Sequence, residues 1–101
     1  MNESITITHN ESGSGGRYEA RVAGRTGVGE LTYRRVSPSR VVANHTGVDD
    51  SLRGTGVGVA LVERLVADAR RDDFTVVPRC SFVSAQSRRH PEWADVFEND
   101  A

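Results

Sequence analysis

The chain has 101 residues and a formal net charge of −1, with 37% hydrophobic and 27% charged residues. This size suits one domain, and we expect a single domain over 1–101 with an ordered core over about 4–98. The near-neutral charge argues against a generic nucleic-acid binder. No apolar run reaches the roughly 18 residues of a membrane span, and the first residues lack a signal-peptide pattern. We therefore expect a cytoplasmic protein without nucleic-acid or membrane partners.

The basic residues are all arginine, and the chain holds one cysteine and no lysine. A single cysteine cannot form an internal disulfide, so the fold needs no oxidising compartment. The lack of lysine excludes a Schiff-base lysine, a lysine general base and the lysine of a phosphate-binding P-loop.

Four strands are expected in the first half of the chain. Apolar and polar residues alternate, or β-branched residues gather, over 4–8, 17–22, 28–36 and about 40–46. The segments between them are turn sequences: the glycine- and serine-rich stretch 11–16, Gly24 to Gly27, and Ser37-Pro38-Ser39. Three hairpin-like connections in succession predict an antiparallel meander.

The hydrophobic period then changes to that of a helix. Small or apolar residues recur at Gly58, Leu61, Val62, Leu65, Val66 and Ala69, which is one face of a helix ending near Asp72-Asp73. A short β-branched run over 74–77 predicts a fifth strand closed by Pro78. Ser81 is expected to cap a second helix over about 82–89, and Pro91 to begin a last helical turn.

The expected order is β-β-β-β-α-β-α. The helical crossover between the fourth and fifth strands makes those two strands parallel neighbours. The predicted fold is α/β (α+β): a compact, mixed, mostly antiparallel sheet with the central helix packed on it.

The connection into the first helix is rich in glycine. It reads Leu52-Arg53-Gly54-Thr55-Gly56-Val57-Gly58. Glycine lets the backbone approach a ligand closely, the start of a helix favours an anion, and Arg53 can add a bidentate contact to a phosphate. Neither the P-loop nor the dinucleotide-binding pattern fits this spacing. The segment thus indicates a phosphate or pyrophosphate site, the alternative being a connection that binds nothing.

Arg53-Gly54-Thr55-Gly56-Val57-Gly58 resembles the R/Q-x-x-G-x-G/A segment of the GNAT superfamily of acyl-CoA-dependent N-acetyltransferases. The chain is most similar to the short, single-domain YjdJ-type GNAT-like proteins. That resemblance rests on four further segments: Gly29-Glu30-Leu31-Thr32-Tyr33, His45-Thr46-Gly47-Val48, Val77-Pro78-Arg79-Cys80-Ser81-Phe82-Val83, and Arg89-His90-Pro91-Glu92-Trp93-Ala94-Asp95. The chain is shorter than the usual GNAT domain and lacks the pair of helices that wall the acceptor site.

The resemblance implies which residues bind acetyl-CoA or another short acyl-CoA. Arg53, Gly54, Thr55, Gly56, Val57 and Gly58 would hold the CoA pyrophosphate. The pantetheine arm would lie between the fourth and fifth strands, against the backbone of His45, Thr46, Gly47 and Val48. No metal site is expected.

Two residues are candidates for the chemistry. His45 lies near the end of the fourth strand, and an imidazole there can take a proton from an amine near neutral pH. Cys80 precedes a helix start, which favours a thiolate, so it can accept an acyl group or pair with CoA. The alternatives are a strand histidine bonded to a neighbouring backbone group and a buried structural cysteine.

The sequence therefore predicts an acyl-CoA-dependent N-acetyltransferase that acts on an amine, either a small molecule or a protein. The alternatives are a CoA- or acyl-CoA-binding module without catalysis and an acyl carrier that works through Cys80. The acceptor, the acyl chain length and the oligomeric state do not follow from the sequence, which is compatible with a monomer.

Overall fold

A computed structural model of the chain describes residues 4–98. The strands are β1 (Ile5–Ser12), β2 (Gly15–Val22), β3 (Gly29–Ser37), β4 (Arg40–Val48) and β5 (Thr75–Pro78). The helices are α1 (Val57–Asp72) and α2 (Ser81–Arg89), and single 3-10 turns, η1 (Asp50–Leu52) and η2 (Pro91–Trp93), follow β4 and α2. The predicted element order is confirmed.

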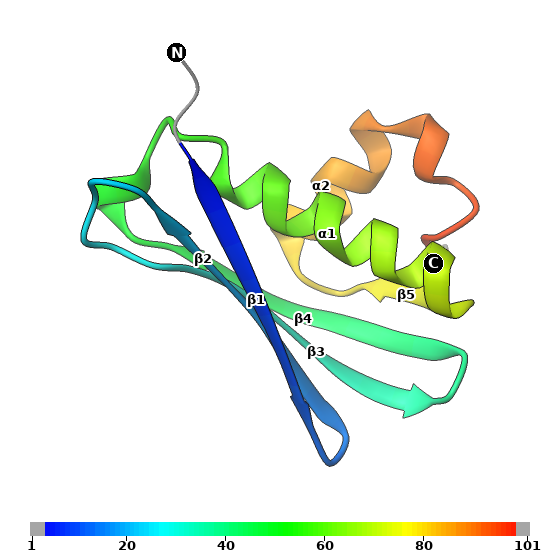
Figure 1. Cartoon of the computed structure of the whole chain (residues 1–101). Coiled ribbons are helices and arrows are strands. Elements are labelled where there is room, and N and C mark those ends of the chain that lie inside the picture. Colours follow the sequence, from blue (N-terminus) through cyan, green and yellow to red (C-terminus); the bar gives the residue numbers. More distant parts are fainter. Residues whose placement is uncertain (1–3, 99–101) are drawn as a thin grey trace.

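The five strands form one sheet in the order β1-β2-β3-β4-β5. The first four strands pair antiparallel, and β5 pairs parallel with β4 because α1 crosses over between them. Figure 1 shows α1 lying across one face of this sheet, with β1 and β5 at opposite edges. The mixed sheet predicted from the sequence is confirmed.

The core lies between α1 and the sheet. Alternate residues of β2 and β3 are buried, among them Tyr18, Ala20 and Leu31. They meet the apolar stripe of α1 that the period of 3.6 predicts, which includes the fully buried Leu61 and Leu65. Burying such a side chain contributes about 1.5–3 kcal/mol, so this layer holds the helix in place.

The ends of several elements differ from the sequence prediction. The first hairpin turns at Gly13 and Ser14 alone. The other residues of the glycine- and serine-rich stretch 11–16 belong to β1 and β2 and pair with one another. Strand β4 continues to Val48 instead of ending near Thr46. Ser81 does not cap α2: the N-cap is Cys80, which makes no side-chain capping bond.

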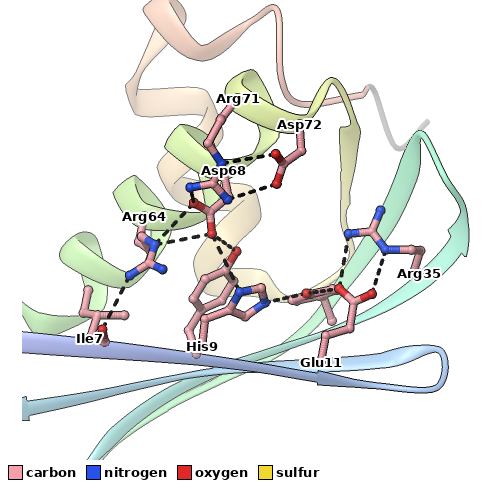
Figure 2. A network of polar contacts seen from close by, with 10 residues as sticks. Ile7, His9, Glu11, Arg35, Arg64, Asp68, Arg71 and Asp72 are labelled. Carbon is pink, nitrogen blue, oxygen red and sulfur yellow. Dashed lines mark hydrogen bonds and ion pairs between the residues drawn. The ribbon is translucent and has the colours of Figure 1, made fainter.

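A polar network joins α1 to the first three strands (Figure 2). Asp68 of α1 is 2% exposed, accepts a hydrogen bond of 2.7 Å from the Tyr18 hydroxyl, and pairs with two arginines of its own helix. The His9 ring stacks on Tyr18 at 4.3 Å between centroids, and its Nε2 lies 2.7 Å from the Tyr33 hydroxyl. The network satisfies the polar groups that this layer buries.

The segment after η2 runs along the outer edge of β5. Val76 forms an isolated parallel bridge with Phe97, and its backbone bonds to Val96 and Glu98. That side of β5 is thereby covered. Within residues 4–98 no helix is both long and apolar enough to span a membrane.

Candidate functional site

Strand β4 has two neighbours over its first half and one over its second. Its pairing with β5 ends at Ala43, which faces Pro78. Its pairing with β3 continues to Val48, which faces Gly29. In the described part of the chain, the stretch from His45 to Val48 therefore has no strand partner on the β5 side. Such an edge offers backbone hydrogen-bonding groups to a ligand.

A β-bulge at Asn44 decides which way the side chains of this stretch point. Tyr33 pairs with Ala43, yet the preceding Thr32 pairs with His45, so Asn44 is the extra residue. The Thr32 hydroxyl donates a 2.6 Å hydrogen bond to the Asn44 side chain. Beyond the bulge, Thr46 and Val48 pair with residues of the face that α1 covers. His45 and Gly47 lie on the opposite face, called the outer face below.

The glycine-rich connection shows why two of its glycines are needed. Gly54 and Gly56 have φ of 83° and 84°, the left-handed region that side chains rarely adopt. Gly56 is the N-cap of α1, makes no side-chain capping bond, and is followed by no acidic residue in the first turn. The first N–H groups of α1 are thus left without a side-chain acceptor, which suits an anionic ligand.

Arg53 is one of the residues that line a hollow beside this connection. The hollow measures about 310 Å³ and is lined by Thr46, Val48, Asp49, Arg53 and Phe82. The Arg53 side chain is 81% exposed, and its Nη2 lies 2.8 Å from Oδ1 of Asp50. This surface ion pair is weak, so the guanidinium can turn to an incoming phosphate. The hollow is thus lined by the free stretch of β4, by the connection that leads into α1, and by Phe82 of α2, whose ring lies against Gly58 in the first turn of α1.

Phe82 is a residue that the sequence analysis missed. A Cβ built on Gly58 would lie 2.8 Å from Cζ of the Phe82 ring, closer than real side chains come. Position 58 is therefore a glycine because α2 places an aromatic ring against α1 there. Gly54 and Gly56, in contrast, are glycines because their backbone has a positive φ. An aromatic residue two positions after a helix-capping cysteine carries no local signal of this contact.

Cys80 lies next to this hollow, in contact with Thr46, one of the residues that line it. Its sulfur is 3.4 Å from the Thr46 hydroxyl. Burial raises the pKa of the Cys80 thiol, but hydrogen bonds from the Thr46 hydroxyl and from the Val83 and Phe82 backbone at the start of α2 oppose it, and the pKa is lowered overall. The thiol is thus more readily ionised than an ordinary one.

His45 does not face Cys80. Its ring is 58% exposed on the outer face, where Nε2 lies 3.3 Å from Oε2 of Glu30. Cys80 instead meets Thr46, the next residue along β4. The two candidate reactive groups therefore lie on opposite sides of one strand, at its unpaired stretch. The structure brings Cys80 into contact with Thr46, which shares the hollow with Val48 and Arg53, and it pairs His45 with Glu30.

This arrangement has the parts that acyl transfer from a thioester needs. An anion-binding helix start and an unpaired strand edge can hold an extended ligand that carries phosphates. A thiol of lowered pKa and an imidazole stand at that edge, one on each side, as groups for proton transfer or nucleophilic attack. Among the described residues, no cluster of His, Cys, Asp or Glu could hold a metal ion.

Comparisons with known proteins show relatives of this fold and sequence. A solved structure with a similar fold is the solution structure of a GCN5-like protein from Staphylococcus aureus, described as a candidate N-acetyltransferase. It shares 26% identity, covers 93% of this chain and 90% of its own, and has a TM-score of 0.70. No curated protein sequence matches the chain significantly. The model of the GCN5-related N-acetyltransferase family matches residues 17–96, most of the chain. The protein therefore belongs to the GCN5-related N-acetyltransferase family.

Proposed function

We propose that the protein transfers the acyl group of acetyl-CoA, or of another short acyl-CoA, to an amine. The observation that carries this proposal is one hollow that is lined by the unpaired stretch of β4 and by Arg53 of the connection leading to the uncapped start of α1. The family generally takes its acyl group from acetyl-CoA. Within it, we propose the YjdJ-type subgroup because of the sequence segments that resemble it. We further propose that the protein acts in the cytoplasm.

The donor is held by two parts of the site. The pyrophosphate binds the N–H groups at the start of α1, between Arg53 and Gly58. The pantetheine arm pairs with the backbone of β4 from His45 to Val48, as an added strand would. The thioester then lies near Thr46, on the side of the hollow that adjoins Cys80.

Transfer consumes an amine and releases CoA. The ammonium gives one proton to His45, and the free amine attacks the thioester carbonyl, so that the C–N bond forms and the C–S bond breaks. The second amine proton goes to the CoA thiolate, and His45 later returns its proton to water. Cys80 offers a second path, in which its thiolate first accepts the acyl group and the amine then attacks that new thioester.

Mass spectrometry after incubation with acetyl-CoA tests the proposal. Native spectra show whether CoA is held, and denatured spectra show whether an acetyl group stays on the protein. Because the chain has no lysine, a retained acetyl must lie on Cys80, a hydroxyl or the N-terminus. The variant Cys80→Ser distinguishes these positions.

Each result has a defined meaning. Bound CoA, with acetylated amine appearing when amines are added, supports transfer. A retained acetyl that Cys80→Ser abolishes assigns the path through the cysteine. Bound CoA without turnover on a panel of amines would contradict transfer and leave a binding module. No bound CoA would overturn the assignment of the glycine-rich connection.

A further inference from the structure

The outer face of the sheet carries two neighbouring rows of polar positions, and one of them ends at His45. In the register of the strands, Arg17 of β2 pairs with Thr32 of β3, and Thr32 pairs with His45 of β4. The neighbouring row holds Glu19, Glu30 and Gly47. His45 and Glu30 are therefore diagonal neighbours on one face, a spacing that long side chains can bridge.

Gly47 leaves the room for this contact. A Cβ built on Gly47 would lie 3.1 Å from Nε2 of His45 and 3.8 Å from Oε2 of Glu30. The ring thus leans over the glycine toward the carboxylate, 3.3 Å away. Any side chain at this position would push against the imidazole, so the glycine serves the placement of the ring.

Arg17 holds the other end of the carboxylate. Its Nε donates a 2.8 Å hydrogen bond to Oε1 of Glu30, and its Nη1 donates one of 2.7 Å to Glu19. Oε1 of Glu30 is thus occupied by Arg17, and Oε2 is left for His45. Across three strands the order is guanidinium, carboxylate, imidazole.

The carboxylate makes the two ring nitrogens unequal. A negative oxygen beside Nε2 favours the form of the neutral ring in which Nε2 carries the hydrogen. Nδ1 is then the nitrogen with a free lone pair, and no hydrogen bond occupies it in residues 4–98. A hollow of about 420 Å³ opens beside this group, lined by Arg17, Val28, Glu30, Gly47, Val48 and Asp49.

The two hollows meet at the end of β4. Val48 and Asp49 line both the hollow of Arg53 and Phe82 and the hollow of the outer face. A group that enters from the outer face therefore approaches the unpaired stretch of β4 from the side opposite Cys80. The hollow of the outer face is lined by two carboxylates, Glu30 and Asp49, and by one guanidinium, Arg17. An alkylammonium group, from a free amine or a lysine side chain, fits this approach because the carboxylates outnumber the guanidinium.

We propose that Glu30, held by Arg17, is a positioning residue that orients His45 so that Nδ1 takes the proton of an alkylammonium acceptor entering from the outer face. This inference rests on the proposed function for the acceptor and on the contacts above for the orientation. The proton moves from the ammonium nitrogen to Nδ1, which leaves the amine lone pair free to attack the acyl carbon. Glu30 itself neither gains nor loses a proton.

Nitrogen-15 NMR of the His45 ring tests the orientation without any substrate. Spectra are recorded as the pH is raised until the ring signals stop changing, so that the neutral ring is observed and its two nitrogens report which one carries the hydrogen. We expect the Nε2–H form in the wild type and a mixture with the Nδ1–H form in Glu30→Ala and Gly47→Ala. Glu19→Gln, which leaves the His45 contact intact, should match the wild type. An unchanged ring in Glu30→Ala, or an Nδ1–H form in the wild type, would overturn the proposal.

Turnover supplies the second readout. With acetyl-CoA as donor, we use two acceptors: spermidine as a small-molecule amine, and a lysine-containing peptide as a model of a protein amine. Comparing turnover of the two distinguishes a small-molecule acceptor from a protein acceptor. Glu30→Ala should lower kcat about tenfold at unchanged KM for acetyl-CoA, because orientation supplies part of the roughly 10²–10⁴-fold that a positioned base contributes. Glu30→Asp, which keeps the negative carboxylate, should recover part of the loss.

The outcomes separate the two proposals. Full turnover by Glu30→Ala would refute the positioning role and leave acyl transfer intact. Turnover with neither amine, despite bound acetyl-CoA, would count against the proposed function, and the NMR result would still decide the orientation of His45.

Discussion

The ring of Phe82 occupies the place where a side chain on Gly58 would have to lie, with Cζ only 2.8 Å from the position of that Cβ. The first turn of α1 and the first turn of α2 are in contact through this pair. Because Phe82 also lines the hollow with Arg53, the contact sets the width of the site where the two helices begin.

We expect Gly58→Ala to lower the free energy of unfolding in the wild type, since overpacking outweighs the gain in helix propensity. In a Phe82→Ala background the same change should instead stabilise the protein by up to about 1 kcal/mol, the ordinary preference of alanine over glycine in a helix. Urea denaturation of the four proteins measures this double-mutant cycle. Additive effects would show that the two residues do not compete for space.

The role assigned to Arg53 predicts weaker binding of CoA by Arg53→Ala. The loss should be about 1.5–3 kcal/mol, the range for a hydrogen bond to a charged group, measured by calorimetric titration with CoA. Arg40→Ala is the matched control, because Arg40 pairs with Glu98 at the other end of β4 and carries the same charge. Equal affinities of the two variants would refute the assignment.

The buried pair of Tyr18 and Asp68 should contribute strongly to stability. Tyr18→Phe removes the 2.7 Å hydrogen bond to the carboxylate while keeping the ring that packs in the core. We expect a loss of about 1.5–3 kcal/mol in unfolding free energy. In an Asp68→Asn background the same substitution should cost less, and an undiminished cost would indicate that packing of the ring dominates.

Glu11 should make the protein sensitive to acid. Hydrogen bonds from Arg35 and then from Tyr33 lower the pKa of Glu11 below its ordinary value of 4.5. A carboxyl group whose pKa falls on folding stabilises the folded state above about pH 4.5, and this stability is lost as the pH falls through the lower, folded value. Chemical denaturation from pH 7 to about pH 2 measures the free energy of unfolding at each pH. We expect this free energy to fall less steeply with decreasing pH for Glu11→Gln than for the wild type. An equally steep fall in both proteins would show that the protonation of Glu11 is not coupled to folding.

The end of α1 offers a pair of opposite substitutions. Asp73, the C-cap, has φ of 58°, the left-handed conformation that glycine adopts most easily. Asp73→Gly should stabilise the protein by about 0.5–1 kcal/mol, the relief of that conformation less the entropy of the unfolded glycine. Asp72→Gly, at the last residue of the helix, where φ is helical, should cost up to about 1 kcal/mol. Thermal denaturation measures the change in stability for both variants. If both changes had the same sign, the assignment of Asp73 as the C-cap would be contradicted.

The sequence predicts the order of elements because hydrophobic periods and turn residues are local signals. It does not predict the direction of His45. Strict alternation from the buried Val41 and Ala43 would point His45 inward, and the extra residue at Asn44 reverses it. A bulge depends on the partner strand, which local sequence does not specify.

Other features of the site also need the assembled fold. The glycine spacing indicates an anion-binding connection. The structure shows two different reasons for glycine: Gly54 and Gly56 have a positive φ, whereas Gly58 leaves space for the ring of Phe82. That contact joins residues 24 positions apart, on elements whose docking depends on the whole sheet. The expected cap at Ser81 was wrong by one residue, a shift that the similar side chains of serine and cysteine hide.

The unpaired stretch of β4 would, on most sheets, be a hazard, because exposed strand edges recruit strands of other molecules and start aggregation. Here the stretch is short and interior: β5 closes one end of it, and Phe82 and Arg53 flank the other. The open stretch, from His45 to Val48, is too short to begin a long ladder with a strand of another molecule. Its length therefore limits the pairing partners of this edge to short segments.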